Sequence, residues 1–304
     1  MDPALWIGVT DTDWFTLLRA IPDLDEANFW QPSPTPVRSL QPGAPFLFKL
    51  HRDNRIVGGG FFAKWTPLRV SMAWDAFGIK NGVASLSEMR ARIERYRRTP
   101  SAPHEDYEIG CILLEELFFL PDSERVVIPD WQPNIVRGKG YPLAQEPGRS
   151  IWAQTQAVLT GTRVGHVAEP AERYGVPQLV RPRLGQGSFR VMVTDAYARR
   201  CAVTGEKVLP VLQAAHIRPY ADGGEHRVDN GLLLRSDLHT LFDRGYLTVT
   251  PEHRVEVSRR LETEFNNGRE YLSLHGTQVA LPQDHDDIPA KEFLEWHNEN
   301  RFVA

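Results

Sequence analysis

Residues 201–245 carry the most restrictive pattern in the chain, because short elements follow one another there with few residues between them. An apolar run from Val211 to Ile217 predicts a strand, and a polar loop with Asp222, Gly223 and Gly224 follows it. A second apolar run, residues 232–234, predicts another strand. Two strands this close together, joined by a polar loop, predict a small compact unit.

The residues after the second strand predict a short helix that presents two polar side chains together. Ser236 can cap a helix over residues 237–244, and Gly245 supplies its C-terminal stop. His239 and Asp243 are four residues apart in this helix, so both project from one face. An imidazole and a carboxylate on one helix face can hold a divalent metal ion.

Five short sequence motifs occur in order between residues 183 and 245: RLGQGSFR, CAVTG, AAHI, NGLLL and LHTLFDRG. Over about residues 181–260 they resemble the HNH (ββα-metal) nucleases of prokaryotic restriction and phage-defence proteins. In this resemblance His216 stands at the first histidine, Asn230 at the asparagine and His239 at the last histidine. It implies a DNA endonuclease whose products carry 5′-phosphate and 3′-hydroxyl ends.

The chemistry of phosphodiester cleavage accounts for these residue types. The reaction needs a deprotonated water and a group that neutralises growing negative charge. A neutral imidazole is a suitable general base near pH 7, and we assign this role to His216. Mg²⁺ or Mn²⁺ would stabilise the phosphorus centre, with His239 and Asp243 as ligands. Asn230 is expected to fix the loop that carries His216 through side-chain hydrogen bonds.

Two features depart from the HNH pattern. Many HNH domains have Asp, Glu or His just before the first histidine as a metal ligand, and this chain has Ala215. The ligand set is therefore open, with Asp237 as a spare carboxylate. Many HNH domains also carry two CxxC pairs, of which only Cys201 is present here. We expect no structural zinc and predict that Cys201 is a buried thiol. His226 is expected to be a solvated loop histidine.

The chain of 304 residues is about twice the usual domain length, which favours two domains. Residues 166–187 are polar and rich in proline and glycine, and we predict a linker there. The expected organisation is a DNA reader domain over residues 1–165 and an HNH endonuclease domain over residues 188–304. The expected fold class is α+β.

The sequence also limits the cellular compartments in which the protein is expected. No apolar run approaches the ~18 residues that cross a bilayer. The N-terminus has no basic stretch followed by an apolar core, so we see no secretory signal. Two cysteines cannot form a disulfide framework. These features together predict a cytoplasmic protein without membrane contact.

Residues 1–165 mix short β-like runs with one clear helix. Residues 45–62 predict two strands around a turn, and residues 85–98 predict a helix. The segments FLFKL, RIVGGGFF, AWDAFG followed by NGV, and IVRGKGY resemble the PUA superfamily, which includes EVE and SRA reader domains. This resemblance implies a small β-barrel with attached helices that flips a modified base into an aromatic pocket.

Two sets of residues would contact DNA on this hypothesis. The candidate walls of the modified-base pocket are Trp30, Trp65, Trp74, Phe77 and Trp152. For each of them, ordinary core packing is the alternative. The candidate phosphate contacts are Arg90, Arg97, Arg98, Arg181, Arg183, Arg235 and Arg244. For these arginines, a solvated outer face is the alternative.

The favoured function is a modification-dependent restriction endonuclease that reads modified cytosine and cuts double-stranded DNA. Three alternatives stay open. The chain could be a sequence-specific or nicking endonuclease on unmodified DNA, or a defence nuclease activated by a nucleotide signal. It could also be a DNA-binding module with a decayed active site, as Ala215 suggests. A double-strand break normally takes two active sites, so we expect a homodimer or sequential nicking.

Overall fold

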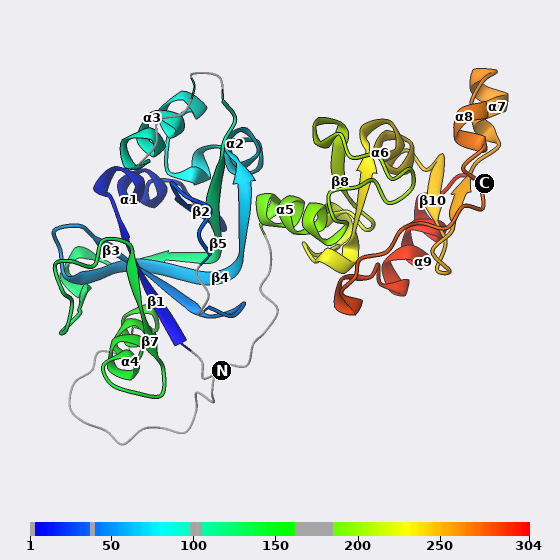
Figure 1. The fold of residues 1–304 in the computed structure, drawn as a ribbon. Helices are drawn as coiled ribbons and strands as arrows, with labels where there is room; N and C mark the ends of the chain where they lie inside the picture. Colours follow the sequence, from blue (N-terminus) through cyan, green and yellow to red (C-terminus); the bar gives the residue numbers. More distant parts are fainter. Residues whose placement is uncertain (1–3, 37–39, 98–101, 103–104, 162–184) are drawn as a thin grey trace. The chain divides into compact units, whose positions relative to one another are not determined.

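The protein is described by a computed structural model that covers residues 4–36, 40–97, 102, 105–161 and 185–304. It divides into two compact units, Met1–Gly185 and Gln186–Ala304, and each is described by itself (Figure 1). Arg98, Arg181, Arg183 and most of the predicted linker over 166–187 lie outside the described residues. Within the described residues, no helix is both long and apolar enough to cross a membrane.

The first unit is built on one mixed sheet with the strand order β2-β5-β4-β3-β1-β7, and β6 pairs with β4. The pairing of β1 with β3 is parallel, whereas the other pairings are antiparallel. The strands are β1 (Ala4–Thr10), β2 (Glu26–Gln31), β3 (Pro45–Leu50), β4 (Arg55–Arg69), β5 (Glu108–Phe119), β6 (Val126–Val127) and β7 (Gly138–Pro142).

This sheet is open, which corrects the predicted β-barrel. A barrel needs its two edge strands to pair, and no pairing between β2 and β7 exists among the described residues. The register of β4 against β5 shifts twice, between Gly59 and Phe61 and between Phe62 and Lys64. Such bulges bend a strand and increase its twist without joining the edges of the sheet. The expected α+β class is confirmed.

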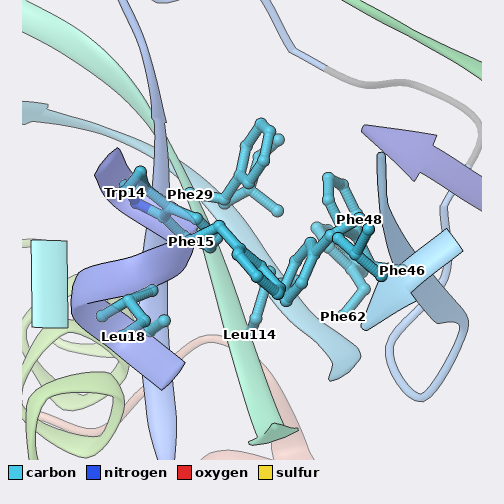
Figure 2. Close-up of a cluster of buried hydrophobic side chains, with 11 residues drawn as sticks. Trp14, Phe15, Leu18, Phe29, Phe46, Phe48, Phe62 and Leu114 are labelled. Atoms are coloured by element: carbon cyan, nitrogen blue, oxygen red, sulfur yellow. The ribbon is translucent and has the colours of Figure 1, made fainter. Parts of the chain in front are cut away.

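Sheet side chains alternate between two apolar clusters, as the two-residue period of a strand requires. Phe46 and Phe48 belong to the cluster that includes Trp14, shown in Figure 2. Leu47 lies between them in sequence and belongs to the other cluster, with Ile151. The sheet is therefore buried on both faces.

Among the described residues of this unit, four α-helices accompany the sheet: α1 (Thr12–Arg19), α2 (Val70–Phe77), α3 (Leu86–Tyr96) and α4 (Gly148–Leu159). Figure 1 shows α1, α2 and α3 near one another and α4 beside β7. The two strands predicted over 45–62 are confirmed as the start of the β3–β4 hairpin. The helix predicted over 85–98 is confirmed as α3, whose first turn is capped by Ser85 through the backbone N–H of Glu88.

The second unit contains two separate two-stranded sheets and five α-helices among its described elements. Strands β8 (Leu212–His216) and β9 (Gly231–Arg235) pair antiparallel, and α6 (Ser236–Asp243) follows β9 directly. Ser236 is the first helical residue rather than the cap, since Arg235 takes the cap position without a side-chain hydrogen bond. The remaining elements are α5 (Gln186–Ala196), β10 (Leu247–Val249), β11 (Val255–Val257), α7 (Arg260–Phe265), α8 (Arg269–Leu272) and α9 (Lys291–Asn300).

Candidate active site

His216 lies at the C-terminal end of β8, and its imidazole is held from two sides. Its Nε2 lies 2.8 Å from Nδ1 of His226. Its ring stacks on Phe189 of α5, with 3.8 Å between ring centroids and 11° between planes. An aromatic face and a hydrogen bond together restrict both the tilt and the rotation of the imidazole.

The environment of His216 keeps its side chain neutral. Burial is the main cause, and the nearby imidazoles of His226 and His239 add to it. Together they lower the pKa of His216 to about 4. At neutral pH the imidazole is therefore uncharged and has a nitrogen that can accept a proton.

Asn230 is fully buried and joins the two ends of the loop between β8 and β9. Its Oδ1 accepts the backbone N–H of Arg218, and its Nδ2 donates to the carbonyls of Arg218 and Glu225, each over 2.9 Å. The backbone N–H of Ile217 also donates to the carbonyl of Asn230. The amide is thus engaged through both its oxygen and its nitrogen, and it holds the backbone immediately after His216.

His239 and Asp243 lie together on α6. Nε2 of His239 is 3.3 Å from Oδ2 of Asp243, whose side chain is 59% exposed. On the other side of the ring, Nδ1 lies 2.8 Å from Oε1 of Gln213 on β8. Because an amide oxygen only accepts, Nδ1 is the donor in this contact, and the lone pair of Nε2 in the neutral ring could then serve a metal ion.

This pair offers one imidazole nitrogen and one carboxylate oxygen, which together can bind a divalent metal ion. Within the described part of the chain, no group of three or more His, Cys, Asp or Glu side chains converges on one point. Ala215 is buried and supplies no ligand. A metal ion held by His239 and Asp243 would complete its coordination with water and DNA phosphate, as Mg²⁺ commonly does.

The spare carboxylate Asp237 is already engaged. Arg235 donates to both of its oxygens over 2.7 Å, and Tyr271 donates to Oδ2 over 3.2 Å. Arg235 is therefore tied to Asp237, whereas Arg244 is exposed at the end of α6. Cys201 is buried, as expected, and its Sγ accepts the backbone N–H of Arg235.

The contact of His226 with His216 was not predicted from the sequence. We expected a solvated loop histidine, but the ring is half-buried, contacts His216, and stacks on Tyr220 with 4.9 Å between centroids and 7° between planes. The only available signal was its position four residues before Asn230, within the loop that Asn230 closes.

The first unit contains a cavity of about 1270 Å³. Its aromatic lining residues are Trp14, Phe29, Trp30, Tyr96 and Tyr107. Gln31 also lines this cavity, and its Oε1 is buried without a hydrogen-bond partner among the described residues. A buried amide oxygen without a partner is costly, so it marks a position where a donor would bind favourably.

Of the five predicted pocket aromatics, Trp30 lines this cavity and the other four do not. Phe77 is buried in the core, and Trp74 is half-buried on α2. Trp65 packs against the cluster that contains Trp14. Trp152 packs edge-on against Phe61, 6.1 Å between centroids.

The predicted phosphate contacts Arg90 and Arg97 both lie over the ring of Tyr107, at 5.3 and 4.0 Å from its centroid. Arg90 also donates to the carbonyl of Glu105, and Arg97 to that of Pro32. Arg97 lines the cavity. These guanidinium groups are therefore fixed beside the cavity rather than spread over the outer face of α3.

Residues 201–250 match the model of a family described as HNH endonuclease. The second unit thus carries an HNH endonuclease segment, and the chain is a DNA-cleaving hydrolase. No curated protein sequence matches the chain.

Three solved structures show a weaker likeness. ASCH from Zymomonas mobilis is 13% identical, over 51% of this chain and 94% of that one, with a TM-score of 0.31. A point mutant of that ASCH protein is 12% identical, over 51% and 96%, with a TM-score of 0.32. A modification-dependent restriction endonuclease, TagI, is 14% identical, over 96% and 80%, with a TM-score of 0.30. TM-scores this low do not establish a common fold.

Proposed function

We propose that this chain is a modification-dependent DNA endonuclease, in which the second unit cuts DNA and the first unit binds a modified cytosine. The observation that carries the proposal is the arrangement around β8, β9 and α6. A neutral imidazole, a loop closed by Asn230, and the His239–Asp243 pair come from this short run of chain. We interpret these elements as a ββα-metal site.

In the proposed reaction, His216 takes a proton from a water molecule, and the resulting hydroxide attacks the phosphorus. The bond from phosphorus to the 3′ oxygen breaks, which leaves 5′-phosphate and 3′-hydroxyl ends. Asn230 keeps the backbone after His216 in place, so that the imidazole is aimed before DNA arrives. A bound Mg²⁺ or Mn²⁺, held by His239 and Asp243, would stabilise the negative charge that develops on the phosphate.

The cavity of the first unit supports a reading role. Trp30 offers an aromatic surface for a flipped base. The unpartnered Oε1 of Gln31 matches the exocyclic amino group of cytosine, which is a donor. Arg97, fixed over Tyr107, places a positive charge beside the same cavity for the flanking phosphate.

The test is a cleavage assay on three versions of one duplex: unmodified, 5-methylcytosine and 5-hydroxymethylcytosine, each with Mg²⁺ or Mn²⁺. We expect the wild-type chain to cut a modified duplex faster. Gln31→Leu should lower the rate on the preferred duplex, because it removes the acceptor for the exocyclic amino group that every cytosine carries. Equal rates on all three duplexes would contradict the reading role and favour a sequence-specific or nicking enzyme.

A parallel arm of the assay adds free nucleotides, because the same cavity could bind a nucleotide signal. Cutting that depends on the added nucleotide would replace the reading role by a signal-activated one.

We also propose that a homodimer makes the double-strand break, since each strand needs an active site. On supercoiled plasmid at enzyme excess, a dimer yields linear product without accumulation of the nicked form. Accumulation of the nicked form before the linear one would indicate sequential nicking instead.

A further inference from the structure

We propose that His226 is a positioning residue for His216, an inference that rests on the proposed role of His216 as general base. The starting point is the 2.8 Å contact between Nε2 of His216 and Nδ1 of His226. Two imidazole nitrogens at this distance share one proton, so the tautomer of one ring fixes that of the other.

Only one direction of this hydrogen bond leaves His216 able to act as a base. If His226 donated from Nδ1, the lone pair on Nε2 of His216 would be occupied. Nδ1 of His216 would then carry the proton of that neutral ring, and neither nitrogen of His216 could accept one. If His216 donates from Nε2, its Nδ1 keeps a lone pair. No described residue hydrogen-bonds to Nδ1 of His216, so that lone pair is available to a water molecule.

The surroundings hold the ring of His226 in place beside His216. Tyr220 stacks on its ring at 4.9 Å and 7°, and Phe189 lies 5.8 Å away while it stacks on His216. The carbonyl of the preceding residue, Glu225, accepts the hydrogen bond from Nδ2 of Asn230. The same asparagine therefore anchors the backbone beside both histidines.

This arrangement gives each ring a separate task. The proton of the attacking water passes to Nδ1 of His216, and the hydroxide oxygen bonds to phosphorus as the bond to the 3′ oxygen breaks. The proton on Nε2 stays hydrogen-bonded to neutral His226, which stabilises the imidazolium that forms. The leaving 3′ oxygen takes its proton from solvent, and His216 later returns its proton to solvent.

Two substitutions separate this role from a merely structural one. His226→Ala removes the acceptor, whereas His226→Asn keeps an oxygen near the position of Nδ1. Orienting partners of this kind typically contribute about 10–100-fold to activity. We expect His226→Ala to lower the single-turnover cleavage rate by that factor at unchanged DNA affinity, and His226→Asn to recover most of it. His285→Ala, at an exposed histidine of the same unit, is the matched control.

The assay is run with the full chain at saturating Mg²⁺ or Mn²⁺, beside wild type and His216→Ala. DNA affinity is measured by fluorescence anisotropy and folding by thermal melting. A wild-type rate for His226→Ala would overturn the inference, as would equal losses in His226→Ala and His226→Asn. An effect of His226→Ala that extra metal ion reverses would assign His226 as a metal ligand and also overturn it. If His216→Ala cuts as fast as wild type, the proposed function itself fails, which is a distinct result.

Discussion

His216 combines the charge state and the orientation that a general base needs. Its imidazole is half-buried, hydrogen-bonded at Nε2 and stacked on Phe189, and its pKa of about 4 keeps it neutral through the physiological range. A low pKa makes the base weaker, but its correct protonation state is fully populated. In the proposed mechanism, the reaction therefore depends on an uncharged nitrogen whose orientation is fixed.

The low pKa predicts an unusual pH dependence of cleavage. The acid limb of kcat/KM reports the free enzyme, so it should reflect the pKa of His216 near 4. Between pH 8 and about pH 5 we expect this limb to stay absent, because His216 remains unprotonated there. Initial rates at low DNA concentration, with thermal melting at each pH as the control, measure it. A fall centred near the ordinary histidine pKa of about 6.5 would contradict this assignment.

We expect replacement of Asn230 to lower both the activity and the stability of the protein. Asn230→Ala removes three hydrogen bonds and leaves the buried loop groups without partners. With each bond worth about 1 kcal/mol, we expect the free energy of unfolding to fall by about 2–3 kcal/mol. Denaturant unfolding measures that loss. Asn230→Asp should also be impaired, because its second oxygen would face two carbonyls. An unchanged unfolding midpoint for both variants would contradict the proposed role of Asn230 in holding the loop between β8 and β9.

Arg235 and Arg244 form a matched pair on either side of α6. Arg235 is engaged by Asp237, whereas the side chain of Arg244 is exposed. Arg244→Gln should weaken DNA binding and lower the slope of log affinity against log salt by about 1, as expected for one lost phosphate contact. Arg235→Gln should mainly lower thermal stability. Salt titrations of binding for both variants test this, and an equal effect on the slope would contradict it.

At the scale of elements, α9 supports α6 through a buried histidine. His297 stacks on Phe242 at 3.7 Å between centroids, and its nitrogens contact Thr248 Oγ1 and the carbonyl of Phe242. Burial lowers the pKa of His297 to about 4. The folded unit therefore holds this ring neutral under conditions where an exposed histidine would take up a proton.

We expect His297 to make the folded protein less stable as the pH falls. The folded-state pKa near 4 lies below the unfolded value, so the unfolded chain binds the extra proton first as the pH falls. The stability contribution is complete above about pH 6.5 and is lost toward pH 4, by about 3 kcal/mol. The melting temperature of His297→Gln should fall less steeply across this window than that of wild type. His285→Gln, at an exposed position, should keep the wild-type slope, and parallel curves for all three would contradict the argument.

Local sequence patterns predicted the elements that depend on local interactions. The β3–β4 hairpin and α3 follow from their turn residues, strand composition and cap. The His239–Asp243 pair follows from helical spacing alone. The contact between His216 and His226 does not, because it depends on how Asn230 folds the loop between β8 and β9. Spacing could not reveal which loop histidine would turn inward.

At the scale of the whole molecule, two features could not be predicted. Whether a sheet closes depends on pairing between its edge strands, and local pattern says nothing about this, so the open sheet differs from the expected barrel. The cavity collects residues from β1, β2, α1, α3 and the segment before β5. Aromatic composition alone therefore identified Trp30 but not Trp14 or Tyr107. The division into two compact units is compatible with the proposal that one unit cuts DNA and the other reads it.

The most direct test of the account is the single-turnover cleavage rate of His216→Ala against wild type on one 5-methylcytosine duplex, with DNA binding measured in parallel. We predict a loss on the order of 10³-fold, typical of a removed general base, at unchanged affinity. Cleavage by His216→Ala within a few-fold of wild type would show that another group activates the water, and it would contradict the account.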